Sequence, residues 1–362
     1  MPAPPGGAES RLQSLSDYYL RVRETTLELV ATLQPEDTVV QTMPDVSPTK
    51  WHLAHTSWFF ERFLLQPHAH NYDVFHDRYD YLFNSYYFTV GQMHRRPERG
   101  LLSRPTLSDI CEYRAHVDEH MLRLLRGELS DELRFLVTLG LNHEQQHQEL
   151  ILTDIKHVFS CNPLQPALRE DTIARGPAAA PMRWLTFKGG TIEAGTNGDG
   201  RFHFDNETPR HQVLLRDYQL ADRPVTNGEF REFIRDGGYE QPDLWLSDGW
   251  STVQNENWRH PLYWCRDLQT EFTLAGRREI DDDAPVCHLS YYEADAFARW
   301  ADARLPTEFE WENAAPADVS GNLLDSGNLH PVPSAQREGL RQMYGDTWEW
   351  TASPYAPYPG FQ

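Results

Sequence analysis

The chain has 362 residues, of which 40% are hydrophobic and 12% aromatic, and this length allows two domains with separate cores. The formal net charge of −21 argues against nucleic acid or an anionic membrane as a partner, because phosphate binding requires clustered Lys and Arg. The four cysteines include no C-x-x-C pair, which argues against a disulfide framework or a thiolate zinc site and suits a reducing cytosol.

The N-terminal segment has the composition of a flexible leader, which we assign to residues 1–9. It lacks the basic region and the apolar core of a signal peptide. No apolar run in the chain approaches the length that spans a bilayer. We therefore expect a cytoplasmic protein.

Helical patterns dominate the first half of the chain. Apolar residues recur at helical spacing, and Ser47-Pro-Thr-Lys50, Thr106-Leu-Ser-Asp109 and Ser130-Asp131 supply caps, with Pro48 at a first helical position. The predicted helices cover residues 10–33, 51–65, 106–126 and 131–159. We predict that they form one bundle core over residues 10–165, and facing side chains in such a core commonly hold a metal.

The fourth predicted helix carries His143-Glu-Gln-Gln-His147. Residues four apart lie on one helical face, so both imidazoles point to the same place, which is a metal-ligand spacing. The pattern also reads H-E-x-x-H, the zinc metallopeptidase signature, with Glu144 as general base. The extended form of that signature is absent, since Leu150 and Thr153 occupy its Gly and His positions.

A third ligand can come from the second predicted helix, which carries His52 and His55. These two residues are three apart, so both lie near a common face, and spacing alone does not choose between them. Because three neutral imidazoles carry no negative charge, a divalent metal bound by them keeps its full positive charge. Some of its coordination positions also stay vacant. Such a site suits Fe(II) that binds an anionic thiolate and dioxygen together.

The long connection over residues 67–105 is predicted to be functional, because loops of this length inside a compact domain usually are. Tyr86 and Tyr87 could donate a proton to reduced oxygen near a metal, or could simply pack in an aromatic loop. Arg96 and Arg99 offer two guanidinium forks for a carboxylate, or else form a solvated basic loop.

The composition changes after the fourth predicted helix. Residues 166–183, rich in Ala, Pro and Arg, indicate a linker. Beyond it, β-like runs at 184–187 and 212–215 and helical pieces at 227–235 and 292–302 alternate with Gly, Asn and Asp clusters. We predict a loop-rich α+β domain over residues 184–362, which ends in a proline-rich turn and so looks cut short.

Several motifs together resemble a known family. WHLAHTSWFFE at 51–61, FNSYY at 83–87, RPERGLLSRP at 96–105 and HEQQH at 143–147 resemble the ergothioneine-biosynthesis sulfoxide synthases, EgtB. RPVTNGEF at 223–230, RLPTEFEW at 304–311 and GDTWEWT at 345–351 resemble the second domain of that family. The implied fold class is α + α/β mixed, an N-terminal DinB-like four-helix bundle followed by a loop-rich, apparently truncated α+β formylglycine-generating-enzyme domain of C-type-lectin-like fold.

The resemblance, which covers nearly the whole chain, also implies roles for single residues. It makes His55, and not His52, the partner of His143 and His147 on Fe(II), with dioxygen as co-substrate. The other implied site residues are Tyr87 with Tyr86 beside it near the reacting oxygen and sulfur, Arg96 and Arg99 on the carboxylate of the thiol donor, and Gln146 on the imidazole of hercynine, the trimethylated histidine substrate.

The implied reaction is oxygen-dependent C–S bond formation between hercynine and cysteine or γ-glutamylcysteine by a non-heme iron(II) sulfoxide synthase in ergothioneine biosynthesis. The expected partners are only small molecules, hercynine and a thiol or selenol donor, with no obligatory protein partner. The second domain has no visible pair of catalytic cysteines, so it is expected to be a scaffold. Three alternatives are a selenoneine synthase that joins hercynine to a selenosugar, an HExxH zinc metallopeptidase, and a thiol-binding or sugar-binding module without catalysis.

Overall fold

The computed structural model describes residues 14–85, 91–170, 176–198, 200–336 and 338–361. The chain divides into two compact units, Met1–Leu164 and Gln165–Gln362. The first is helical and the second mixes helices with short strands, as the predicted fold class requires. Within the described residues, no helix has both the length and the apolar character to cross a membrane.

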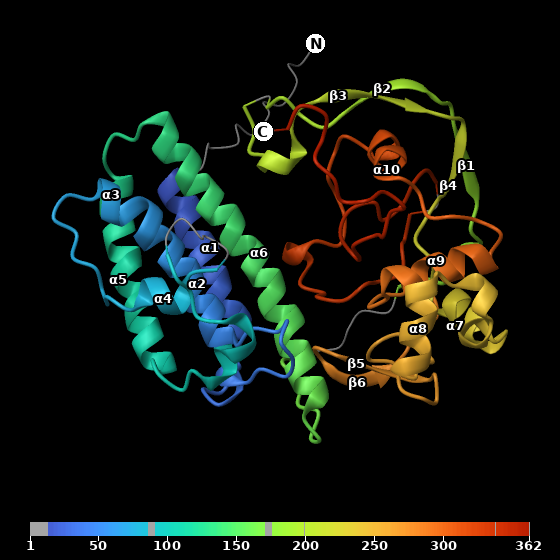
Figure 1. Cartoon of the computed structure of the whole chain (residues 1–362), viewed down its shortest axis with the longest axis horizontal. Coiled ribbons are helices and arrows are strands. Elements are labelled where there is room, and N and C mark those ends of the chain that lie inside the picture. Colours follow the sequence, from blue (N-terminus) through green and yellow to red (C-terminus); the bar gives the residue numbers. More distant parts are fainter. Residues whose placement is uncertain (1–13, 86–90, 171–175, 199, 337, 362) are drawn as a thin grey trace, which may run out of the picture. The chain divides into compact units, whose positions relative to one another are not determined.

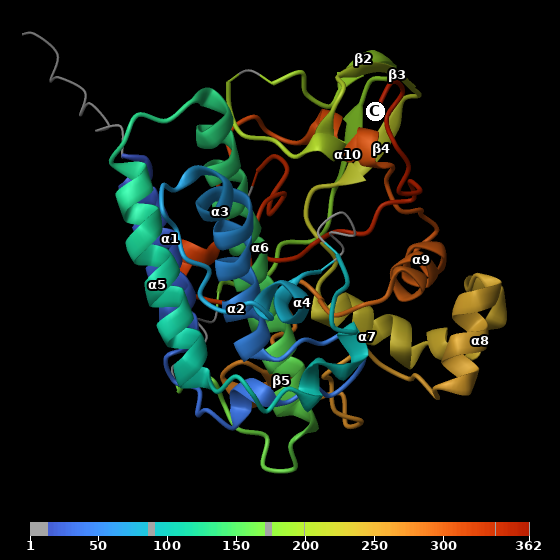
Figure 2. The same cartoon turned by 60° about the vertical axis from the view of Figure 1, so that its left-hand side comes forward.

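Over the residues described, the first unit is a bundle of four long helices (Figures 1 and 2). These helices are α1 (Leu15–Val30), α2 (Thr49–Phe60), α5 (Leu107–Leu125) and α6 (Asp131–Cys161). Helix α2 packs against α5 and α6, and α1 packs against α6. Shorter elements connect them: α3 (Gln66–His68), α4 (Tyr79–Phe83), a π-helical turn (Glu61–Leu65) and 3-10 turns at Asp37–Val39 and Arg96–Leu101. The predicted four-helix bundle is confirmed.

The helix starts follow the predicted capping residues with one exception. Thr106 and Asp109 form a reciprocal capping box at α5, and the Ser130 hydroxyl accepts from the backbone N–H of Leu133 at α6. At α2 the prediction is wrong by one residue, because Pro48 precedes the first helical residue. The φ angle that proline fixes is also compatible with the extended backbone there. Proline therefore marks the start of the helix without deciding whether it is the last residue before the helix or the first residue in it.

Helix α2 is the centre of the bundle, and all twelve of its residues are buried. A helix that is covered on every side belongs to the core, and its polar residues therefore need partners inside the protein. Helix α6 approaches it closely at Gly140, where an added Cβ would lie 2.7 Å from a ring carbon of Phe60 and 2.8 Å from one of Phe59. Glycine weakens a helix interior, but here it lets α6 lie against α2 one turn before His143.

The second unit contains three two-stranded antiparallel ribbons and four helices within its described residues (Figure 1). The ribbons pair β1 (Trp184–Phe187) with β4 (Tyr218–Ala221), β2 (Gly190–Ala194) with β3 (His211–Leu215), and β5 (Thr270–Thr273) with β6 (Gly276–Glu279). The helices are α7 (Asn227–Arg235), α8 (Ser247–Asn255), α9 (Tyr291–Trp300) and α10 (Glu308–Ala314). Both predicted strands and both predicted helices are present, and β2, β4, β5, β6, α8 and α10 were not foreseen.

Two helix starts in this unit use the same motif, an Arg with Thr three residues later and Glu six residues later. At α7, Arg223 donates from both terminal nitrogens to the carboxylate of Glu229, at 2.9 and 2.7 Å. The Thr226 hydroxyl accepts from the backbone N–H of Glu229 and completes a capping box. The same contacts recur at α10 with Arg304, Thr307 and Glu310. Two of the three motifs that carry the family resemblance in this half, RPVTNGEF and RLPTEFEW, thus form helix caps.

Candidate metal centre

Three histidines from two helices of the first unit converge on one point. One ring nitrogen from each of His55, His143 and His147 lies within 4.8 Å of the corresponding atoms of the other two. Nε2 of His55 and Nε2 of His143 lie 3.2 Å apart. Two nitrogens that each lie about 2.1 Å from one metal ion have a separation of this size.

Outer hydrogen bonds turn the second ring nitrogen of two of these histidines away from the shared point. His55 Nδ1 lies 2.6 Å from the carbonyl oxygen of Phe83, to which it donates. His147 Nδ1 lies 2.8 Å from Nδ1 of His52. The first of these hydrogen bonds leaves Nε2 of His55 as a lone-pair donor, and metal-binding histidines commonly use such outer partners. His143 has a buried Nδ1 without a hydrogen-bond partner among the described residues.

The three imidazoles are neutral at physiological pH. Burial lowers the pKa of His143 to about 4. Burial also holds the pKa of His55 and of His147 well below the ordinary value, and neighbouring histidines and the Arg99 charge add to this effect. Neutral imidazole is the form that binds metal, so the residues present fit a divalent first-row metal ion.

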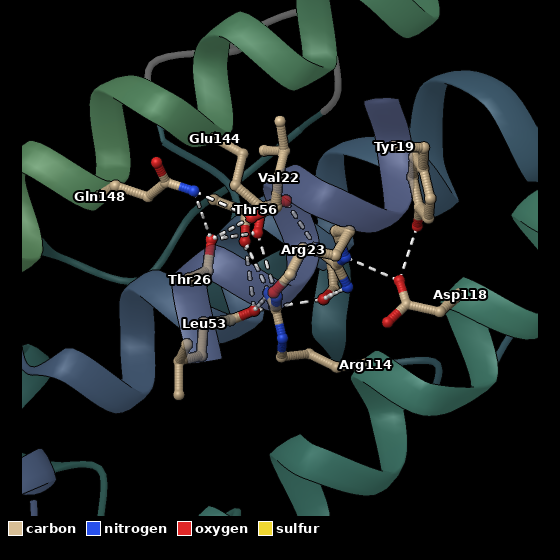
Figure 3. Close-up of polar contacts among 11 residues, drawn as sticks. Tyr19, Val22, Arg23, Thr26, Leu53, Thr56, Arg114, Asp118, Glu144 and Gln148 are labelled. Carbon is tan, nitrogen blue, oxygen red and sulfur yellow. Dashed lines mark hydrogen bonds and ion pairs between the residues drawn. The ribbon is translucent and has the colours of Figure 1, made fainter. Parts of the chain in front are cut away.

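Glu144, between the histidines in sequence, lies in a separate buried charge network (Figure 3). Its carboxylate is fully buried and accepts from Arg23 at 2.8 Å, from Arg114 at 3.0 Å and from the Thr26 hydroxyl at 2.7 Å. Asp118 accepts from Nε of Arg23 at 2.7 Å. Because these residues come from α1, α5 and α6, and Arg114 also donates to α2, the network ties all four long helices together.

The residues of this network keep the Glu144 carboxylate ionised. Burial alone would raise its pKa, but the charges of Arg23 and Arg114 and the hydrogen bonds from Arg23 and Thr26 lower it to about 2. A general base must reach a metal-bound water and accept its proton. Glu144 is instead saturated by two guanidinium groups and a hydroxyl, which disfavours the metallopeptidase reading of H-E-x-x-H.

A buried positive charge lies beside the histidine cluster. The Arg99 guanidinium carbon is 3.3 Å from the ring centroid of Trp51, and Trp51 stacks on His55 with 4.6 Å between ring centroids. Arg99 donates to the hydroxyls of Ser47 and Ser85 at 2.9 and 3.1 Å. Its side chain is buried, so its charge is poorly screened and favours an anion at the site.

The other predicted site residues are placed differently. Arg96 is half-buried, and its guanidinium donates to the backbone carbonyl of Asp45. Gln146 is exposed on α6, between the two histidines of that helix. Tyr86 and Tyr87 lie outside the described residues. The structure thus brings together the three histidines and Arg99.

Sequence reasoning missed the groups that support the cluster, chiefly Asp154, Arg23 and Arg114. Asp154 Oδ2 lies 3.0 Å from Nε2 of His52, and it is seven residues after His147, two turns along the same helix face. This spacing in the sequence could have indicated that Asp154 lies near the histidines. Arg23 lies on the buried face of α1 with Tyr19 and Thr26, where a lone basic residue is unusual and needs a buried partner.

Comparisons with known proteins match both units. The DinB superfamily model matches residues 18–151, and the sulfatase-modifying factor enzyme 1-like domain model matches residues 171–338. The chain is 33% identical to the hercynine oxygenase of Mycolicibacterium smegmatis, over 96% of this chain and 85% of that protein. It is 31% identical to the hercynine oxygenase of Mycobacterium tuberculosis, over 96% of this chain and 86% of that protein. It is also 31% identical to the inactive C-alpha-formylglycine-generating enzyme 2 of Mus musculus, over 47% of this chain and 68% of that protein.

Proposed function

The chain belongs to the hercynine oxygenase family, and from this membership we propose that it uses dioxygen to join hercynine to a sulfur donor as a sulfoxide, in ergothioneine biosynthesis. The observation that carries the proposal is the convergence of His55, His143 and His147 in a chain related to these enzymes over nearly its whole length. We further propose that the three histidines bind Fe(II). When bound, the iron supplies the redox chemistry by which dioxygen oxidises a thiolate.

The protein's own residues prepare the site for an anionic donor. Three neutral imidazoles add no negative charge, and the buried guanidinium of Arg99 adds a positive one. Trp51, itself buried, covers one face of His55 and keeps water from it. A donor with both a carboxylate and a thiolate fits this charge pattern, which supports cysteine or γ-glutamylcysteine over a selenosugar without a carboxylate.

Three parts of the proposal rest on the family resemblance. Tyr87, with Tyr86 beside it, is proposed as the proton donor to reduced oxygen. Arg96 is proposed to assist Arg99 with the donor carboxylate, and Gln146 to contact the imidazole of hercynine. A cytoplasmic location is also proposed, in accord with the four described cysteines, none of which forms a disulfide.

The function is tested by supplying each donor in turn. The purified chain is incubated without oxygen with Fe(II) and hercynine, oxygen is then admitted with cysteine, γ-glutamylcysteine or a selenosugar, and products are identified by mass spectrometry. We expect a hercynine sulfoxide adduct with a carboxylate-bearing thiol. An adduct formed only with the selenosugar would assign selenoneine synthesis, and oxygen uptake without an adduct from any donor would overturn the proposed function.

Replacing Arg99 by Met is expected to raise KM for the thiol donor by about 10–100-fold, because hydrogen bonds to charged groups contribute about 1.5–3 kcal/mol. KM for hercynine should stay nearly the same, since the proposal places the carboxylate of the thiol donor, and not hercynine, against the Arg99 guanidinium. Steady-state kinetics with one substrate varied at a time provide the measurement. Arg95→Met is the matched control, because Arg95 is exposed and pairs with Glu98 at 2.6 Å. Equal increases in both KM values after Arg99→Met would indicate a general loss of structure.

A further inference from the structure

A chain of hydrogen bonds runs from the start of α2 to the back of the histidine cluster. The backbone N–H of Ser47 donates to Oδ2 of Asp154 at 2.8 Å. The same oxygen lies 3.0 Å from Nε2 of His52, and Nδ1 of His52 lies 2.8 Å from Nδ1 of His147. His52 is 2% exposed and Asp154 is 9% exposed, so these contacts are inside the protein. Both ring nitrogens of His52 therefore have hydrogen-bond partners.

With a neutral His52 ring, the partners fix the direction of each of these hydrogen bonds. Asp154 Oδ2 already accepts from Ser47, and a carboxylate accepts only, so Nε2 of His52 must be the donor to it. A neutral His52 ring with its proton on Nε2 has a lone pair on Nδ1. That lone pair can only accept, so Nδ1 of His147 carries a proton and donates it. The remaining nitrogen of His147, Nε2, is then a lone pair for a metal.

We propose that His52, held by Asp154, is a positioning residue that fixes the tautomer and the ring orientation of His147 for metal binding. This inference rests on the proposed metal centre and deepens it. It gives His52 a function distinct from that of His55, although the two side chains are three residues apart on one helix. His52 does not bind the metal, because its two nitrogens contact Asp154 and His147.

Two amide substitutions at position 52 separate the two hydrogen bonds of this side chain. In His52→Asn, the amide oxygen takes the place of Nδ1, so it can still accept from His147 but cannot reach Asp154. In His52→Gln, the amide nitrogen takes the place of Nε2, so it can still donate to Asp154 but leaves His147 without an acceptor. Both variants lose the same ring and differ little in polarity.

The measurement is metal affinity of the full chain. Binding of Fe(II) without oxygen, and of Co(II) as a spectroscopic probe, is measured in competition with a chromogenic chelator, and urea unfolding of the metal-free chain is measured beside it. We expect His52→Gln to weaken metal binding by about 10–100-fold, the usual effect of removing an outer partner of a metal ligand, and to alter the Co(II) absorption spectrum. His52→Asn keeps the acceptor for His147, so its loss of metal affinity should stay below about 10-fold, the lower end of that range.

Each other outcome overturns the inference. Equal affinity in the unchanged chain and His52→Gln would show that His147 needs no acceptor from His52. Equal loss of affinity in both variants, with equal loss of stability, would reduce His52 to a packing role. If the unchanged chain itself binds neither metal, the proposed metal centre fails together with this inference, whereas metal binding that is insensitive to position 52 leaves the proposed function standing.

Discussion

His143→Ala is expected to release the metal and to abolish sulfoxide formation. The substitution removes one of three donors that lie within 4.8 Å of one another, and two imidazoles on different helices do not replace a three-donor site. The loss of metal affinity should exceed the ~10–100-fold that follows removal of an outer partner. Equilibrium metal binding and product formation, measured on the same preparation, test this expectation.

The bundle contains its own control for this substitution. His116 and His120 are also four apart on one helix, α5, with ring centroids 4.4 Å apart. They belong to no group of three possible ligands among the described residues. His116→Ala should therefore bind metal like the unchanged chain. If His143→Ala retained stoichiometric metal and activity, or if both variants lost them equally, the assignment of the cluster as the metal centre would fail.

Glu144→Gln is expected to lower the free energy of unfolding by about 3–5 kcal/mol, because it removes the negative charge between two buried guanidinium groups. Arg23 and Arg114 are 2% and 1% exposed, so water cannot replace the lost partner. Replacement by an amide keeps the size of the side chain, which separates the effect of charge from that of a cavity. Urea unfolding of the metal-free chain, followed by circular dichroism, gives the measurement.

An exposed ion pair in the same bundle provides the comparison. Glu119 pairs with Arg123 one turn along α5, and both side chains are more than half exposed. Glu119→Gln should leave the free energy of unfolding nearly unchanged, since exposed pairs contribute little. A Glu144→Gln variant with unchanged stability and lost peptide hydrolysis would favour the metallopeptidase instead. Our expectation is the reverse, lower stability with the metal site still able to form.

Local sequence signals were sufficient for the bundle helices and for two of the three histidines of the cluster. Thr106 with Asp109 and Ser130 marked the starts of α5 and α6, because capping is a contact between residues three apart. Helical periodicity likewise placed His143 and His147 on one face. The small strands β2 and β4 were missed, since each carries little local pattern and is held by pairing with a strand that is distant in the sequence, β2 with β3 and β4 with β1.

The tertiary structure determined which side chains meet, which spacing in the sequence could not predict. His52 and His55 are equivalent by helical geometry, and only the packing of α2 against α6 puts Nε2 of His55 3.2 Å from His143 while His52 reaches the back of His147. Glu144 fits a peptidase motif in sequence, yet its partners Arg23 and Arg114 are 121 and 30 residues away and come from other helices. The sequence by itself determined which residue types could bind a metal and on which helix face they lie. The packing of separate helices determined which of them meet, because contacts between distant residues depend on how whole elements bury their surfaces together.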